Sequence, residues 1–124
     1  MRLNPDCIRD ILLSVEEKCD FRNGFMFPSE IERLNKYDQE EVLYHLKQCQ
    51  LSGLLHKVTF YLNGSCYVND LSPSGHQFLA DIRTDNNWTK TKTIAENVGS
   101  YSLDILKSIA SGVIAGLVNK QLGI

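Results

Sequence analysis

The chain has 124 residues and a formal net charge of −2, and 43% of its residues are hydrophobic. This length fits one compact domain, or a small domain with an added helix, and is too short for two full domains. The hydrophobic fraction, with only three prolines, excludes wholesale disorder. The small net charge provides no bulk attraction to nucleic acid or anionic lipid, so any such contact has to come from a local patch.

Cysteine usage and the lack of an apolar leader indicate the compartment. Cys7, Cys19, Cys49 and Cys66 are too few for a disulfide scaffold and include no Cys-x-x-Cys pair, so we interpret them as reduced, mostly buried thiols and expect no metal and no cofactor. The first ten residues carry four charged side chains, unlike a signal peptide. No uncharged run exceeds 12 residues, the length of 108–119, which is fewer than the roughly 20 that span a bilayer. A cytoplasmic protein is predicted.

The first third of the chain predicts a helix, a short strand and a second short helix. Asn4 is a favourable N-cap before Pro5, and apolar residues then recur at helical spacing up to Lys18. A strand is expected over 25–27, after an Asn-Gly turn. Ser29-Glu30-Ile31-Glu32 has the spacing of a capping box, which predicts a short helix ending near Leu34.

The middle third predicts a helix followed by a hairpin. Asp38 and Glu41 repeat the capping pattern, and the helix that they begin is expected to end at Gly53. Strands over 57–62 and 65–71 flank Asn63-Gly64, the strongest short-range signal for a hairpin. The order helix, strand, helix, helix, hairpin predicts an α+β fold with a winged helix-turn-helix core.

The last third predicts three more helices. Ser72 and Pro73 begin one that ends near Arg83, and we interpret 85–87 as a polar break. A helix over 89–98 follows, with Ile94 and Val98 facing inward, and then an amphipathic helix over 102–122. We therefore expect a winged-helix domain at 5–83 and a carboxy-terminal helical extension at 84–124.

A segment near the middle of the chain carries a family resemblance. The run 71–83, Leu-Ser-Pro-Ser-Gly-His-Gln-Phe-Leu-Ala-Asp-Ile-Arg, is followed by Trp88 and resembles the Leu-Thr-x-x-Gly-His-x-Phe-Leu-x-x-Ile-Arg segment of a phage- and prophage-encoded family, domain of unknown function 2513. Runs 8–13, 42–46 and 52–55 support the same resemblance. It implies a small bacterial or phage protein with a winged-helix core and no assigned catalytic residues. The last helix departs from the family pattern, because small residues occur where a more lysine-rich amphipathic helix is usual in the family.

A winged helix can bind DNA or contact another protein. If the fold binds DNA, the 38–52 helix enters the major groove and the hairpin touches phosphate. Acidic residues crowd the start of that helix, and the hairpin residues 58–69 carry no charge, both of which oppose contact with a phosphate backbone. We therefore favour contact with protein and keep a DNA-binding transcriptional regulator as the alternative. The candidate nucleic-acid contacts are Arg33, Lys36, Gln39, His45, Lys47, Gln48, Lys90 and Lys92.

The carboxy-terminal helix offers a candidate surface for self-association. Ser108, Gly112 and Gly116 are four residues apart, a spacing at which small residues let helices approach closely. The apolar face of this helix is expected to be covered by the protein's own core, by a second copy in a homodimer, or by a membrane surface. The membrane surface is disfavoured because the helix has only two basic residues. A small membrane-active toxin is the corresponding further alternative. The candidate residues are Leu106, Ile109, Gly112, Val113, Gly116 and Leu117.

No pattern typical of catalysis is present in the sequence. His45 and Cys49 share a helical face but lack a second pair of metal ligands. The adjacent glutamates of 16–17 and 40–41 point in different directions on a helix, and there is no phosphate-binding glycine loop. The expected function is that of a non-enzymatic phage or prophage accessory or regulatory protein that acts by protein contact.

Overall fold

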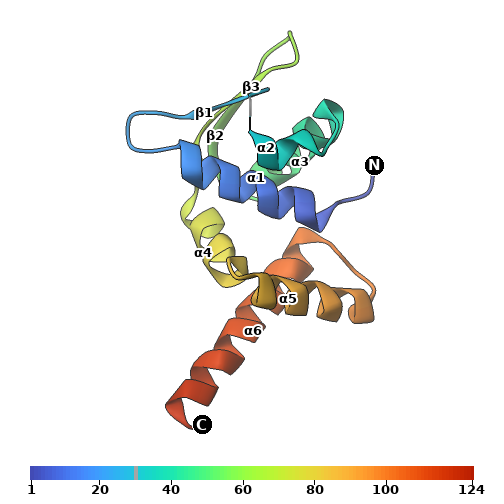
Figure 1. Cartoon of the computed structure of the whole chain (residues 1–124), viewed down its shortest axis with the longest axis vertical. Coiled ribbons are helices and arrows are strands. Elements are labelled where there is room, and N and C mark those ends of the chain that lie inside the picture. Colours follow the sequence, from blue (N-terminus) through green and yellow to red (C-terminus); the bar gives the residue numbers. More distant parts are fainter. Residues whose placement is uncertain (30) are drawn as a thin grey trace.

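The computed structural model describes residues 1–29 and 31–124, and it contains helices and a small three-stranded antiparallel sheet that lies toward one end of the molecule (Figure 1). The predicted α+β class with a carboxy-terminal helix is confirmed, and the order of elements is consistent with a winged-helix-like architecture. The elements are α1 (Pro5–Lys18), β1 (Phe25–Phe27), α2 (Glu32–Asn35), α3 (Gln39–Leu51), β2 (Leu55–Phe60), β3 (Cys66–Leu71), α4 (Pro73–Ile82), α5 (Asp85–Val98) and α6 (Leu103–Leu122).

Helix α1 is the centre of the fold. Its cap is the predicted one, since the side-chain oxygen of Asn4 accepts from the backbone N–H groups of Asp6 and Cys7. The expected apolar face is completely buried and contacts elements on both sides. In Figure 1, α3 lies above α1, and α4 and α5 lie below it. The residues of that face are Ile8, Ile11, Leu12 and Val15.

The sheet has β3 in the middle, paired antiparallel with β1 and β2. Strand β2 begins at Leu55, two residues before the predicted start at 57, and ends at Phe60 instead of 62. It begins early because Gly53, at φ 76°, closes α3 abruptly: the N–H of Gly53 donates to Gln50 and that of Leu54 to Cys49. It ends early because the hairpin loop is wider than two residues, with the N–H of Tyr61 donating to the carbonyl of Ser65.

Strand β2 is an edge strand with an irregular backbone. Lys57 has a positive φ of 52°, a conformation that costs energy for any residue with a Cβ. One residue further on, the carbonyl of Val58 accepts from the side-chain amide of Gln50 on α3, at 3.4 Å. The outer side of β2 is therefore partly occupied by α3 and is not a straight row of free backbone groups.

The predicted capping boxes of α2 and α3 differ from the observed helix starts. The N-cap of α2 is the buried Ile31, not Ser29, and Ile31 makes no side-chain capping bond. Glu30, the second residue of that predicted box, lies outside the described residues. Asp38 occupies the N-cap position of α3 as predicted, but its carboxylate makes no capping bond. Helices α2 and α3 therefore both begin without a side-chain cap, and burial of their apolar side chains determines where they start.

The start of α4 is fastened to the turn between α3 and β2. The Ser72 hydroxyl accepts from the N–H of Gly75 at 3.0 Å and donates to the carbonyl of Gly53 at 2.5 Å. The N–H of Ser72 donates to the carbonyl of Leu54 at 3.0 Å. A Cβ at Gly75 would lie 2.0 Å from that same carbonyl oxygen, so only glycine fits there. The Ser-x-x-Gly part of the family-like segment thus lets the first turn of α4 pack directly against the backbone between α3 and β2.

The predicted polar break before α5 is wrong, because residues 85–87 form the first turn of that helix. The Thr84 hydroxyl caps it by accepting from the N–H of Asn87 at 3.1 Å, and Asp85 is favourable next to the helix amino terminus. The inward face is also not the expected one. Ile94 and Val98 are 37% and 62% exposed. The helix instead buries Trp88, Thr91 and Ala95.

Helix α6 is divided into a packed half and a projecting half. Ser102, the first residue of the predicted helix, caps it, and Leu103, Leu106 and Ala110 are buried in the same hydrophobic cluster as the side chains of α1, α3 and the sheet. From residue 115 onward every residue is exposed. Figure 1 shows this half extending past α5, away from the rest of the molecule.

Candidate interaction surfaces

His45, a candidate nucleic-acid contact, is an internal residue. Its side chain is completely buried, and its Nε2 accepts from the backbone N–H of Asn4 at 2.8 Å. Since a backbone N–H can only donate, Nδ1 carries the proton and donates to the carbonyl of Glu41 at 2.7 Å. Both ring nitrogens are therefore occupied, and the ring has no edge free for a nucleic-acid base.

Three of the basic candidates take part in ion pairs within the protein. Arg33 pairs with Glu17 at 2.9 Å, and Lys36 pairs with Asp10 at 3.1 Å. Lys92 donates to Asp6 at 2.8 Å. Each charge is already partly neutralised, which lowers its contribution to phosphate binding.

The remaining candidates do not form one basic patch. Lys47 lies over the ring of Phe60, 5.1 Å from its centroid. Gln39 is exposed and Gln48 half-buried on α3, whereas Lys90 is exposed on α5. Figure 1 shows α1 between α3 and α5. The face of α3 and the lysines of α5 are consequently parts of different surfaces.

The tip of the hairpin is apolar and exposed. Phe60 and Tyr61 are partly exposed, and the side chain of Leu62 is fully in solvent. Between the hairpin and α3 lies a hollow of about 330 Å³, lined by residues that include Leu43, Lys47 and Phe60. The lack of charged residues on the hairpin can be seen in the sequence. The position of its aromatic side chains beside α3 could not be predicted, because it depends on the pairing register of β2 and β3.

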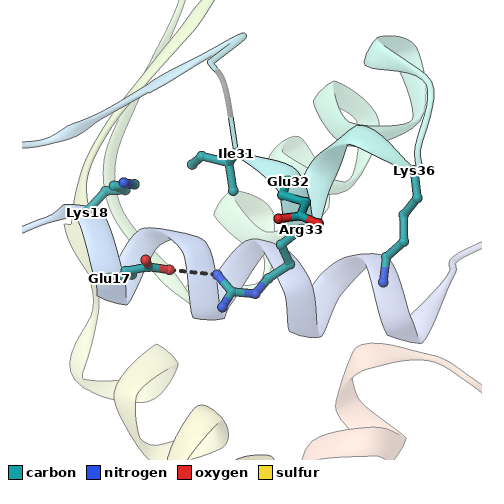
Figure 2. Close-up of a pocket in the computed structure, with 6 residues that line it drawn as sticks. All are labelled: Glu17, Lys18, Ile31, Glu32, Arg33 and Lys36. Atoms are coloured by element: carbon teal, nitrogen blue, oxygen red, sulfur yellow. Dashed lines mark hydrogen bonds and ion pairs between the residues drawn. The ribbon is translucent and has the colours of Figure 1, made fainter.

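A polar groove of about 570 Å³ lies between α1 and α2 (Figure 2). Figure 2 shows Arg33 reaching from α2 to Glu17 on α1, with Lys36 extending in the same direction. The hydrogen bond from Arg33 holds the pKa of the Glu17 carboxyl below its usual range. The lining carries two acidic and three basic side chains, and two of the basic ones, Arg33 and Lys36, are already paired with Glu17 and Asp10. Its lining is Glu17, Lys18, Ile31, Glu32, Arg33 and Lys36.

An apolar groove of about 530 Å³ lies between α5 and α6. Helix α5 contributes Lys90 and Ile94, and α6 contributes one side of its projecting half. Five of the six candidate self-association residues are in the lining, whereas Leu106 is buried in the core. We call this feature the α5–α6 groove. Its lining from α6 is Ile109, Gly112, Val113, Gly116, Leu117 and Lys120.

The two glycines of this groove face open space. A Cβ built at Gly112 or at Gly116 would have no heavy atom within 4 Å outside the helix's own nearby backbone. Glycine inside a helix costs about 1 kcal/mol relative to alanine, and packing within this chain does not require it at either position. Across the described residues, no helix is long and apolar enough to cross a membrane.

The cysteines are free thiols, as predicted, and three of the four are buried. Burial raises the pKa of Cys7 to about 12 and those of Cys19 and Cys66 to about 11, and it also raises the pKa of Cys49. These thiols are protonated at neutral pH and are poor nucleophiles. In the part of the chain that the structure describes, no three histidine, cysteine or acidic side chains are grouped to hold a metal.

Comparison with known proteins defines the family. The chain belongs to the family described as hypothetical protein (DUF2513), whose model matches residues 2–102 and so stops immediately before α6. It is also similar to an uncharacterized protein of Haemophilus influenzae (strain KW20 / Rd), with 33% identity over 121 residues, covering 95% of this chain and 99% of that protein. No solved structure shows a significant match.

Proposed function

We propose that this member of the DUF2513 family is a winged-helix accessory or regulatory protein of a phage or prophage, without enzymatic activity, that acts by protein contact through the α5–α6 groove. The observation that carries the proposal is the exposure of apolar side chains on two adjacent helices, with Ile94 on α5 and Leu117 on α6 both lining the groove. A contiguous apolar surface rimmed by polar residues is typical of a protein interface.

The charge distribution supports protein contact over DNA contact. The first turn of α3 carries Glu40 and Glu41, and negative charge there repels phosphate. Arg33, Lys36 and Lys92 are in ion pairs. The alternative, a DNA-binding regulator, is favoured by one observation, the exposure of Lys47 on the helix beside the hairpin.

A titration with duplex DNA separates these two functions. We expect binding to random duplex at physiological salt to be weak or absent in fluorescence anisotropy, because few unpaired basic side chains share one surface. Submicromolar binding with a steep salt dependence, abolished by Lys47→Ala, would contradict the proposal and support the DNA-binding alternative.

A paired-variant experiment tests the groove itself. We expect the tagged wild-type chain to be recovered in a stoichiometric complex, with itself or with another polypeptide. Val113→Lys with Leu117→Lys places two charges in the groove and should abolish this complex, because buried unpaired charge is costly. The matched control is Ser111→Lys with Ala115→Lys, exposed positions outside the groove lining, which should keep it. Equal loss in both variants, or no complex with wild type, would overturn the proposal.

A further inference from the structure

The isolated chain exposes more surface than a compact monomer of its mass. Its accessible surface is 7462 Å², whereas folded monomers of 14.1 kDa average about 6,700 Å². The excess of roughly 700 Å² is close to the 800 Å² or so that each partner buries in a standard protein interface. Burial of one interface of ordinary size would therefore lower the accessible surface area of this chain to the value expected of a compact protein.

The projecting half of α6 is exposed at every residue from 115 onward. Its residues 115–119 carry no charge, and the neighbouring apolar side chains of Leu117 and Val118, about 100° apart around the helix, are both exposed. Exposed apolar side chains over so wide an arc of a helix are typical of an interface. Helix α5 lies beside it along the groove, to which it contributes Lys90 and Ile94.

The charges of α6 follow a self-complementary pattern along one row of the helix. Every fourth residue from 104 to 120 is exposed, and the row begins with an acid, continues with three small residues and ends with a base. Residues four apart form a continuous ridge on a helix surface. The row is Asp104, Ser108, Gly112, Gly116 and Lys120.

We propose that the occupant of the α5–α6 groove is helix α6 of a second copy of this chain, packed antiparallel with its two-fold axis at Gly112. This inference rests on the proposed function and names its partner. In this arrangement Gly112 meets Gly112 of the second copy, and Ser108 meets Gly116. Asp104 of each copy then lies beside Lys120 of the other. Three pairs of small residues let the two backbones approach closely at the crossing.

The charges select the antiparallel orientation. The groove has Lys90 and Lys120 among its lining residues, both far along the chain from the 99–102 connection between α5 and α6. A parallel pair would place these lysines against the same lysines of the second copy. An antiparallel pair brings the carboxylate of Asp104 to them instead, and this carboxylate is 95% exposed, with only a 3.9 Å contact to Lys107. Opposite helix dipoles add to the preference.

Sedimentation velocity across micromolar concentrations tests the association. We expect a dimer for wild type and a monomer for Gly112→Leu, because two leucines at the axis hold the helices apart. The monomer itself tolerates this leucine, since a Cβ there has open space. Circular dichroism should therefore show a cooperative unfolding transition for the variant. The control is Ser111→Leu, which adds the same side chain outside the groove lining and should remain a dimer. A monomeric wild type would overturn the inference.

A charge exchange tests the pairing of Asp104 with Lys120. Asp104→Lys alone and Lys120→Asp alone should each weaken the dimer about tenfold or more, because each change creates two repulsive pairs per dimer. The double variant should return to within about threefold of wild type. The two residues are about 24 Å apart along one helix, so such a rescue has to be intermolecular. Additive weakening in the double variant would contradict the proposed register.

Cysteine cross-linking tests the orientation. Mixed chains carrying Ser108→Cys and Gly116→Cys should form a disulfide between unlike chains faster than either variant with itself, whereas a parallel pair would link like chains. The native thiols react slowly by comparison, since three are buried and burial raises the pKa of Cys19, the half-buried one, to about 11. A monomer that still forms a groove-dependent complex with a different polypeptide would refute the second copy and leave the proposed function standing.

Discussion

Gly75 allows the first turn of α4 to lie directly against the backbone of Leu54. Gly75→Ala should lower the free energy of unfolding by more than about 2 kcal/mol, because its Cβ would overlap a carbonyl oxygen that has no room to move. Urea denaturation measures the change. The control is Ser74→Ala, at an exposed position in the same turn, which should change the free energy of unfolding by less than about 0.5 kcal/mol. Equal effects at both sites would contradict this account.

His45 joins the chain segment before α1 to α3 through two hydrogen bonds. His45→Leu keeps a side chain of similar size but leaves the N–H of Asn4 without an acceptor, which should cost about 1–3 kcal/mol of unfolding free energy. Chemical denaturation is the measurement. His76→Leu, at an exposed position, should change stability by less than about 0.5 kcal/mol. A neutral His45→Leu would show that this bond contributes nothing.

At the scale of elements, α1 connects the sheet-bearing part of the molecule to α4 and α5. Arg9 on α1 donates to the carbonyls of Ile82 and Arg83, at 3.1 and 2.6 Å, and so caps the end of α4. Asp6 accepts from the indole N–H of Trp88 and from Lys92, each at 2.8 Å. The position of α5 is thus set by polar contacts with the first helix as well as by burial of Trp88.

The Asp6 contact should make stability depend on pH in the acid range. Burial by itself would raise the pKa of Asp6, but the bonds from Lys92 and Trp88 outweigh it and lower that pKa below its usual value. A carboxyl with a lowered folded-state pKa stabilises the protein above its unfolded pKa of about 3.9, and this stabilisation disappears as pH falls through the folded-state pKa.

Asp6→Asn should therefore lower the unfolding free energy at pH 7 by about 1 kcal/mol, a modest figure because the carboxylate is half exposed. The difference from wild type should disappear as pH falls below the lowered folded-state pKa of Asp6, because the wild-type carboxyl is then protonated. Urea denaturation at pH 7 and at a series of lower pH values measures it. Glu96→Gln, at an exposed position on α5, should show no such pH-dependent difference, and a constant deficit for Asp6→Asn would refute the explanation.

Element types were predictable from local signals, and their boundaries were less so. Asn4, Ser72 and Ser102 each cap the helix that the sequence indicated, because a capping side chain bonds only to its own first turn. The start of α5 was missed because Asp-Asn-Asn is as typical of a turn as of a helix amino terminus. The buried face of α5 could not be predicted, because the position of Trp88 depends on its hydrogen bond to Asp6, which is 82 residues away in the sequence.

At the scale of the molecule, the core continues into α6 only as far as Ala110. A chain shortened to residues 1–111 should keep its cooperative unfolding transition, because the removed residues are mostly exposed. A chain shortened to residues 1–102 should melt at least about 10 °C lower, since it uncovers the apolar side chains against which Leu103 and Leu106 pack. Differential scanning calorimetry of both chains distinguishes them, and similar melting temperatures would contradict this division of α6.

Sequence reasoning located the candidate groove in part. The residues that α6 contributes follow from helical spacing alone, and five of the six named in advance line it. The contribution of Ile94 could not be recognised, because the same spacing placed it in the core. Nor could the burial of His45 be foreseen, since its acceptor role depends on a backbone N–H 41 residues earlier.

The irregular edge of the sheet has a consequence for how copies of this chain meet. A fibril grows when a straight strand adds to an uncovered strand, backbone to backbone. Strand β2 resists such addition, because Lys57 turns its backbone out of the extended conformation and places a charge on the rim, while Gln50 already occupies the carbonyl of Val58. Even at high concentration, stacking by sheet extension is therefore disfavoured on this side.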